Sequence, residues 1–309
     1  MTEPSKEVRA TERRNPQSAD IDTFDASQLV DLFVAEDAMV SPAVGRARDA
    51  IGRAIELIES AFRRGGRLLY VGAGTSGRLG VLDASECPPT FGTPADMVQG
   101  IIAGGPPALV KSVEGAEDSA ESGAAAIADR QVNGADIVVG IAASGTTPFV
   151  HGALQYARTV DARTVLLTCA EPPPGSNDRC DVVIHVDVGP ELVTGSTRLK
   201  AGTATKLVLN MLTTGAMIRI GKTYGNLMVD LQATNAKLRD RGERIVMEVL
   251  GVNRDAARDA VRAARGKVRT AIVMLHDHIG YAAAEARLAS VDRRLRAIVG
   301  PPPPATGPS

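Results

Sequence analysis

Five short apolar runs between positions 67 and 188 constrain the fold of this chain more than any other feature. Most are continuously apolar rather than alternating, which is typical of strands in a parallel sheet covered on both faces. Segments with helical spacing of apolar residues lie between most of them. The runs are RLLYVG (67–72), MVQGIIAG (97–104), DIVVGIAAS (136–144), RTVLLTCA (163–170) and DVVIHVDV (181–188). This alternation predicts an α/β fold with a mainly parallel sheet flanked by helices.

Further helices are expected before and after these strands. Residues 26–64 carry apolar residues at helical spacing, and Pro42 should divide them into two helices. Long helices are expected over 196–221 and 226–251, and three shorter ones within 254–299.

Four segments are expected along the chain. They are an irregular N-terminal arm (1–25), an α/β domain with its N-terminal helices (26–242), a small C-terminal helical unit (243–299) and a tail (300–309). The sequence of the tail, PPPPATGPS after one glycine, is typical of disorder.

Composition excludes several classes of protein. The formal net charge is −1 over 309 residues, which argues against a broad electrostatic contact with nucleic acid. The sequence has neither an apolar run long enough for a bilayer nor an N-terminal signal-peptide pattern, so we expect a cytoplasmic protein without a membrane partner. The three cysteines form no C-x-x-C pair, which favours a reducing compartment and no structural metal.

The turn after the first apolar run carries a phosphate-binding pattern. GAGTSG (72–77) fits G-x-G-x-x-G, with hydroxyls on Thr75 and Ser76. A dinucleotide site needs an acidic residue at the end of the next strand, but the nearest candidate, Asp96, precedes that strand. The pattern therefore favours a compact phosphate over a dinucleotide.

A second turn has the same character. AASGTTP (142–148) follows an apolar run and opens a helix, whose N-terminal N–H groups attract anions. Two such turns on nearby parallel strands could surround one phosphate. Ordinary helix capping by Ser and Thr is the alternative. The candidate phosphate ligands are Thr75, Ser76, Ser144, Gly145, Thr146 and Thr147.

The two turns resemble those of the sugar isomerase (SIS) domain, and longer blocks resemble the N-acetylmuramic acid 6-phosphate etherases. The resemblance covers roughly residues 10–300. It implies a flavodoxin-like SIS sheet, a C-terminal unit similar to a ubiquitin-associated (UBA-like) domain, a homodimer, and no metal or redox cofactor. The blocks are LDASECPPTFG (82–92), IAGG (102–105), VEGAEDS (113–119), GIAASGTTPFV (140–150), VTGSTRLKAGTATKLVLNMLTTGAM (193–217) and GNLMVDLQATNAKL (225–238).

The resemblance also implies a reaction. Enzymes of this family remove the D-lactyl ether from C3 of N-acetylmuramic acid 6-phosphate by elimination and then hydration. They serve peptidoglycan recycling and amino sugar catabolism. The resemblance places the two catalytic carboxyls at Glu86 and Glu117. Glu86 would protonate the leaving oxygen and Glu117 would remove the C2 proton, although the exchanged assignment stays open.

Other positions carry weaker expectations. Many relatives have Arg where this chain has Thr146, so anion preference here can differ. Glu191 is expected either to contact sugar hydroxyls or to cap the following helix. Arg198 and Lys200 are expected either to pair with the lactyl carboxylate or to lie on a solvated helix face. Asn235 is expected to line the pocket.

Two rival functions use the same fold. An aldose–ketose isomerase also needs a base near C2 but no acid at the C3 oxygen. A sugar-phosphate sensor would keep both turns and need neither glutamate. For the homodimer, the small-residue helix 200–217 could pack against a partner helix, although packing within one subunit explains it equally well.

Overall fold

The computed structural model describes residues 9–231 and 236–304. These residues form two compact units. The first contains the described chain through Ser85 together with Ala95–Ala216, and the second contains Glu86–Pro94 and the described chain from Met217 onward.

The first unit is built on a five-stranded sheet in which every pairing is parallel, in the order β2-β1-β3-β4-β5. Each of the five apolar runs contains one strand. The strands are β1 (Leu68–Gly72), β2 (Val98–Ile102), β3 (Ile137–Ile141), β4 (Arg163–Thr168) and β5 (Val182–His185). The predicted α/β fold is confirmed, and all residues of β1 and β3 are buried, as a sheet covered on both faces requires.

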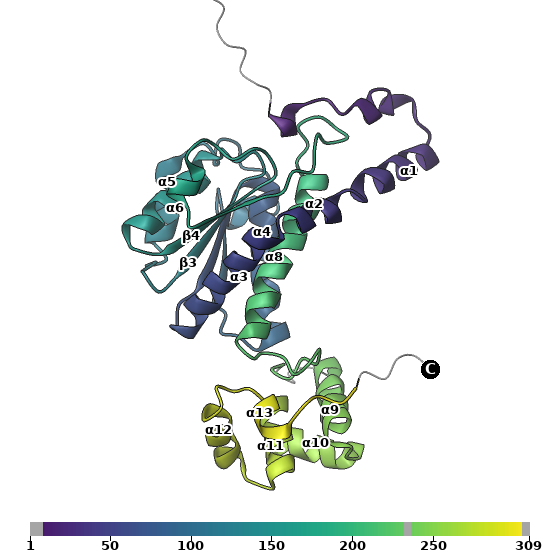
Figure 1. The fold of residues 1–309 in the computed structure, drawn as a ribbon, viewed down its shortest axis with the longest axis vertical. Coiled ribbons are helices and arrows are strands. Elements are labelled where there is room, and N and C mark those ends of the chain that lie inside the picture. Colours follow the sequence, from purple (N-terminus) through teal and green to yellow (C-terminus); the bar gives the residue numbers. More distant parts are fainter. Residues whose placement is uncertain (1–8, 232–235, 305–309) are drawn as a thin grey trace, which may run out of the picture. The chain divides into compact units, whose positions relative to one another are not determined.

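Helices cover both faces of this sheet (Figure 1). On one face, Leu69, Val138 and Leu166 share a core with residues of α5 and α6. On the other face, the hydroxyl of Tyr70 lies 3.5 Å from the carbonyl oxygen of Leu209 on α8. The helices after β1 are α4 (Gly74–Phe91), α5 (Ala120–Ala128), α6 (Pro148–Thr159), α7 (Ser176–Arg179) and α8 (Lys200–Arg219).

The N-terminal region forms three short 3₁₀ turns and then three helices. The expectation of two helices divided at Pro42 is wrong, because Pro42 lies in the first turn of a helix, where its missing N–H is not needed. The 3₁₀ turns are Ala10–Glu12, Pro16–Ser18 and Ile21–Thr23, and the helices are α1 (Ala26–Asp37), α2 (Val40–Arg46) and α3 (Arg48–Arg63). None of the residues of α1 is buried, and Figure 1 shows α1 projecting from the rest of this unit.

The second unit is helical. Its helices are α9 (Ala236–Leu250), α10 (Arg254–Ala263), α11 (Val268–Asp277), α12 (Tyr281–Ala289) and α13 (Arg296–Val299). The expected helix over 226–251 is wrong in its first part, because Tyr224 and Leu227 form an antiparallel bridge and the chain makes turns at 225–226 and 229–230. Val229 and Leu231 are buried there, in the core of this unit.

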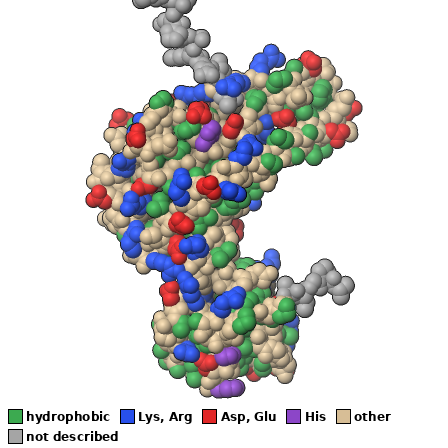
Figure 2. All heavy atoms as spheres, viewed as in Figure 1, with side chains coloured by type: hydrophobic (Ala, Val, Ile, Leu, Met, Phe, Trp, Pro, Cys, Tyr) green, Lys and Arg blue, Asp and Glu red, His purple; other side chains and the backbone are tan. Residues whose placement is uncertain are grey.

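The surface carries both signs of charge. On the face shown in Figure 2, acidic and basic side chains are interspersed. Among the described residues, no helix has both the length and the apolar character needed to cross a membrane.

Candidate functional site

The two phosphate-type turns leave the sheet side by side. β1 and β3 are parallel neighbours, and Gly72, which ends β1, is paired with Ile141, which ends β3. The first turn leads into α4 at Gly74 and the second into α6 at Pro148. Two helix N-termini therefore begin at the same edge of the sheet, where α/β folds bind ligands.

Backbone packing shapes the first turn. A methyl group added at Gly72 would lie 2.7 Å from the amide nitrogen of Gly77, and one added at Gly77 would lie 2.6 Å from Cγ1 of Ile102. Glycine is required at both positions because the helix starts in contact with the strand. Thr75 and Ser76 lie half-buried in the first turn of α4.

Hydrogen bonds shape the second turn. Gly145 has a φ of 76°, and its amide donates to the carbonyl oxygen of Ala142 at 2.8 Å. The hydroxyls of Ser144 and Thr146 lie 3.3 Å apart. Thr147 is the N-cap residue of α6, yet its side chain makes no capping hydrogen bond. The capping alternative therefore does not account for Thr147.

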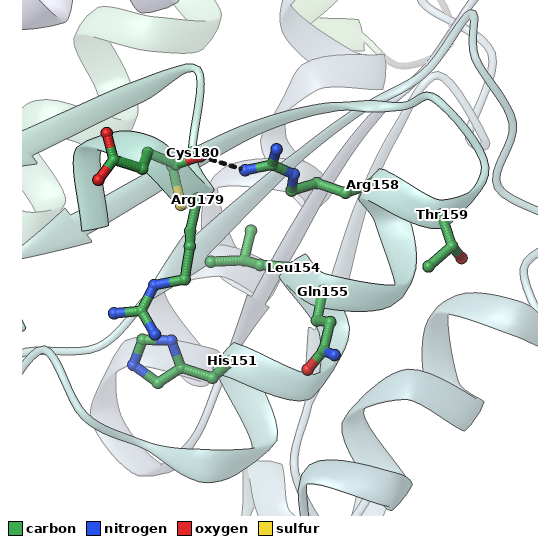
Figure 3. Close-up of a pocket in the computed structure, with 8 residues that line it drawn as sticks. His151, Leu154, Gln155, Arg158, Thr159, Arg179 and Cys180 are labelled. Atoms are coloured by element: carbon green, nitrogen blue, oxygen red, sulfur yellow. Dashed lines mark hydrogen bonds between the residues drawn. The ribbon is translucent and has the colours of Figure 1, made fainter. Parts of the chain in front are cut away.

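His151, which the sequence analysis missed, stabilises the second turn through a hydrogen bond to its backbone. Its Nε2 donates to the carbonyl oxygen of Gly145 at 2.8 Å. Because the peptide is trans, the amide of Thr146 points the opposite way from that carbonyl. His151 also lines a cavity of about 570 Å³ beside α6 and α7, together with Leu154 and Arg158 (Figure 3).

Glu117 lies in a polar recess beside the first turn. The recess has a volume of about 240 Å³, and Gly74, Arg78 and Glu114 also line it. The carbonyl oxygen of Glu117 accepts the amide of Phe149 at 3.0 Å, which ties this loop to the start of α6. The structure thus brings Glu117 to the phosphate-type turns, while its side chain stays exposed. Arg78 is a second lining residue that the sequence analysis missed.

Glu86 is exposed on the later part of α4. About three helical turns separate it from Thr75, so their backbones are ~16 Å apart. One turn before Glu86, Asp83 is buried and accepts a hydrogen bond from Asn210 Nδ2 at 2.7 Å. Burial raises the pKa of Asp83, although the bond from Asn210 partly offsets this effect.

Glu191 caps α8. Its two carboxylate oxygens accept the amides of Lys200 and Ala201, each at 2.9 Å. Only 1% of Glu191 is exposed, and burial raises its pKa while the two amides oppose that shift. This geometry fits the capping alternative, and a contact between Glu191 and sugar remains a prediction.

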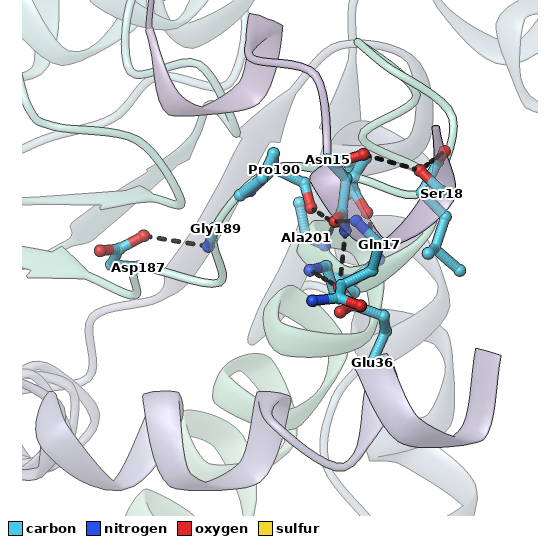
Figure 4. Close-up of polar contacts among 11 residues, drawn as sticks. Asn15, Gln17, Ser18, Glu36, Asp187, Gly189, Pro190 and Ala201 are labelled. Atoms are coloured by element: carbon cyan, nitrogen blue, oxygen red, sulfur yellow. Dashed lines mark hydrogen bonds and ion pairs between the residues drawn. The ribbon is translucent and has the colours of Figure 1, made fainter. Parts of the chain in front are cut away.

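Lys200 lies in a buried ion pair. Its Nζ is 2.5 Å from Glu36 Oε2, and Asn15 donates to the same carboxylate oxygen at 2.8 Å (Figure 4). The solvated helix face considered for Lys200 is wrong because only 4% of the residue is exposed. Arg198 is exposed, and Asn235 lies outside the described residues.

An arginine from the N-terminal arm reaches the second turn. Arg9 Nη1 donates to Thr146 Oγ1 at 2.5 Å. Within the described chain, no group of three His, Cys, Asp or Glu side chains is arranged to hold a metal ion.

Comparisons with known proteins identify the fold and close relatives. Residues 50–158 match the family described as the glucokinase regulatory protein N-terminal SIS domain, which confirms the expected SIS-type α/β fold. Among solved structures, a phosphoheptose isomerase from Francisella tularensis aligns with a TM-score of 0.47 and 17% identity, covering 62% of this chain and 98% of that chain.

Two curated relatives are much more similar in sequence. The N-acetylmuramic acid 6-phosphate etherase of Gloeobacter violaceus is 56% identical over 271 residues, which cover 88% of each chain. The N-acetylmuramic acid 6-phosphate etherase of Rhodopirellula baltica is 50% identical over 292 residues, which cover 94% of this chain and 96% of the relative.

Proposed function

The chain belongs to the N-acetylmuramic acid 6-phosphate etherase family, and we propose that it cleaves the D-lactyl ether of N-acetylmuramic acid 6-phosphate. The products are N-acetylglucosamine 6-phosphate and D-lactate, and the activity is that of a carbon–oxygen lyase in peptidoglycan recycling and amino sugar catabolism. The observation that carries this conclusion is the 56% identity over 88% of the chain.

The 6-phosphate binds where the two turns meet. Hydroxyls of Thr75, Ser76, Ser144 and Thr147, with amides at the starts of α4 and α6, act as donors. The position of Gly72 opposite Ile141 supports this assignment, because it places both turns beside one another.

Glu117 is the base in this proposal. The ring opens, the C1 aldehyde acidifies the C2 proton, and a carboxylate removes that proton. Two features support Glu117: it lines the recess next to Gly74, and its backbone is held by the amide of Phe149. Arg78 lines the same recess and adds positive charge to it.

Glu86 is the acid. It protonates the ether oxygen as lactate leaves C3, and it later helps water to add to the unsaturated aldehyde. The exchanged assignment, with Glu86 as the base and Glu117 as the acid, is the alternative. The side chain of Glu86 is exposed, so substrate can reach it.

A second copy of the chain completes the site. A single sugar phosphate does not bridge the ~16 Å of α4 between Thr75 and Glu86. We therefore assign Glu86 to the site of the partner in a homodimer. An apolar groove of about 730 Å³, lined by residues of α2, α3 and α8, and the unburied helix α1 offer surfaces for that partner.

The cellular location is also a proposal. A phosphorylated sugar does not cross a bilayer unaided, so an enzyme that acts on it belongs with the cytoplasmic pool. Cell fractionation with an antibody against the chain tests this location, and recovery in the membrane or periplasmic fraction would contradict it.

The direct test of the function is release of D-lactate from N-acetylmuramic acid 6-phosphate. Wild-type protein should release it, and Glu86→Gln should lower kcat by about 10²–10⁴-fold because a general acid is lost. Binding of the substrate without lactate release would support the sensor instead. Interconversion of aldose and ketose phosphates without lactate release would support the isomerase.

Mixed dimers test the shared site. Glu86→Gln protein, which should be nearly inactive, and Ser144→Ala protein, which should bind substrate more weakly, are unfolded together and refolded, and activity is measured with substrate well below the wild-type KM. If Glu86 serves the partner's phosphate site, a mixed dimer contains one intact site, and activity should return to roughly half the wild-type value per dimer. Activity no greater than the mean of the parent proteins would place both groups in one subunit.

A further inference from the structure

Arg9 brings a positive charge to the second turn from far away in the sequence. Its guanidinium donates to Thr146 Oγ1 at 2.5 Å, across 137 positions of the chain. The turn itself, residues 142–147, contains hydroxyls and glycine but no charged side chain. Arg9 therefore supplies a positive charge that the turn's own residues lack.

The arm that carries Arg9 is held by buried polar contacts. The carbonyl oxygen of Thr11 accepts the amide of Gly195 at 3.2 Å. Asn15 donates to the carbonyl oxygen of Pro190 at 3.3 Å, and Ser18 donates to that of Leu192 at 2.7 Å (Figure 4). Because these side chains are buried, the path of the arm toward the turn is built into the fold.

Arg9 also lacks a counter-charge. In the part of the chain that the structure describes, no carboxylate forms an ion pair with Arg9, and its side chain is exposed. A planar guanidinium with five donors can hold one hydroxyl and still offer paired donors to an anion. The second turn therefore combines hydroxyls, a helix N-terminus and an unneutralised guanidinium.

We infer that Arg9 binds the 6-phosphate of the substrate, together with Ser144 and Thr147. This inference rests on the proposed function, because it names a further ligand of the same phosphate. Thr146 then acts through its hydroxyl, which positions the guanidinium. Arg9 makes the site prefer a dianionic phosphate over an uncharged sugar, and it acts on affinity rather than on bond cleavage.

The test compares Arg9→Gln with Arg14→Gln, a change of equal charge at an exposed position of the same arm. KM and kcat are measured by D-lactate release, and binding of N-acetylglucosamine 6-phosphate, which has no lactyl carboxylate, is measured by calorimetry. Arg9→Gln should weaken both ligands by about 10- to 100-fold with kcat nearly unchanged, since a charge-assisted bond is lost. Arg14→Gln should match the wild type, and Arg9→Lys should recover part of the loss.

The outcomes separate the explanations. Unchanged affinity for both ligands in Arg9→Gln would overturn the inference. Arg9 would then only attach the N-terminal arm to the second turn. Weaker binding of the substrate alone would also overturn it, because Arg9 would then recognise the lactyl carboxylate. If wild-type protein releases no lactate, the proposed function fails, but weaker binding of N-acetylglucosamine 6-phosphate by Arg9→Gln would still support the phosphate contact.

Discussion

The two turns at the edge of the sheet have similar sequences but are held in different ways. In the first turn, Gly72 and Gly77 bring a strand and a helix into direct backbone contact. In the second turn, His151 and Arg9 hold the loop through hydrogen bonds. A turn fixed by backbone contact tolerates little change, whereas one held by side chains can be adjusted by residues elsewhere in the chain.

The largest effect should come from breaking the first turn. In Gly77→Ala, the added methyl would meet Ile102 Cγ1 at 2.6 Å and the carbonyl oxygen of Gly72 at 2.7 Å. The backbone cannot yield, so the free energy of unfolding should fall by ~3 kcal/mol in urea titrations. Gly202→Ala is the matched control, because its methyl would make ordinary contacts at 3.6 Å. Equal stability of both variants would contradict the packing argument.

A smaller effect, on binding alone, should come from the second turn. Ser144→Ala removes a hydroxyl whose only contacts are with Thr146 among the described residues, so stability should stay within ~0.5 kcal/mol of wild type. Affinity for N-acetylglucosamine 6-phosphate should fall about 10-fold by calorimetry, because a bond to a charged phosphate is lost. Ser122→Ala, an exposed serine on α5, is the control. If stability fell while affinity held, the hydroxyl would be structural.

The smallest effect should come from removing the hydrogen bond between His151 and the second turn. His151→Leu leaves the carbonyl of Gly145 without its donor, which frees the amide of Thr146 to turn. KM for the sugar phosphate should rise about fivefold, the equivalent of ~1 kcal/mol, with little change in kcat. His151→Gln, whose amide can donate, should restore part of the affinity. An unchanged KM in His151→Leu would mean that the turn holds its shape without this bond.

The sheet and the two turns were predictable because their signals are local. Continuous apolar runs mark buried parallel strands, and glycines with hydroxyls mark strand-to-helix turns. Errors arose where local signals compete. The segment from Gly225 to Leu231 is as apolar as a helix, but it forms turns around the bridge between Tyr224 and Leu227, and its buried residues pack in the core of the helical unit.

The supports of the site were not predictable, because they join residues that are distant in sequence. No spacing rule connects Arg9 with Thr146 or Glu36 with Lys200. Glu191 shows the same difficulty. From the sequence, a single carboxylate before a helix can either contact a bound sugar or cap the helix. Only its hydrogen bonds to two backbone amides, seen in the structure, favour the cap.

The carboxylate of Glu36 serves two elements at once, the arm through Asn15 and α8 through Lys200. Moving α1 away would therefore leave the buried ammonium of Lys200 and the buried amide of Asn15 without their partner. The free-energy cost would be far above that of losing a surface contact. Although α1 buries none of its own residues, its last turn cannot fray alone. In hydrogen exchange, we expect the amides near Glu36 to open in one concerted event with the 3₁₀ turn at Asn15, whereas the beginning of α1 should exchange sooner.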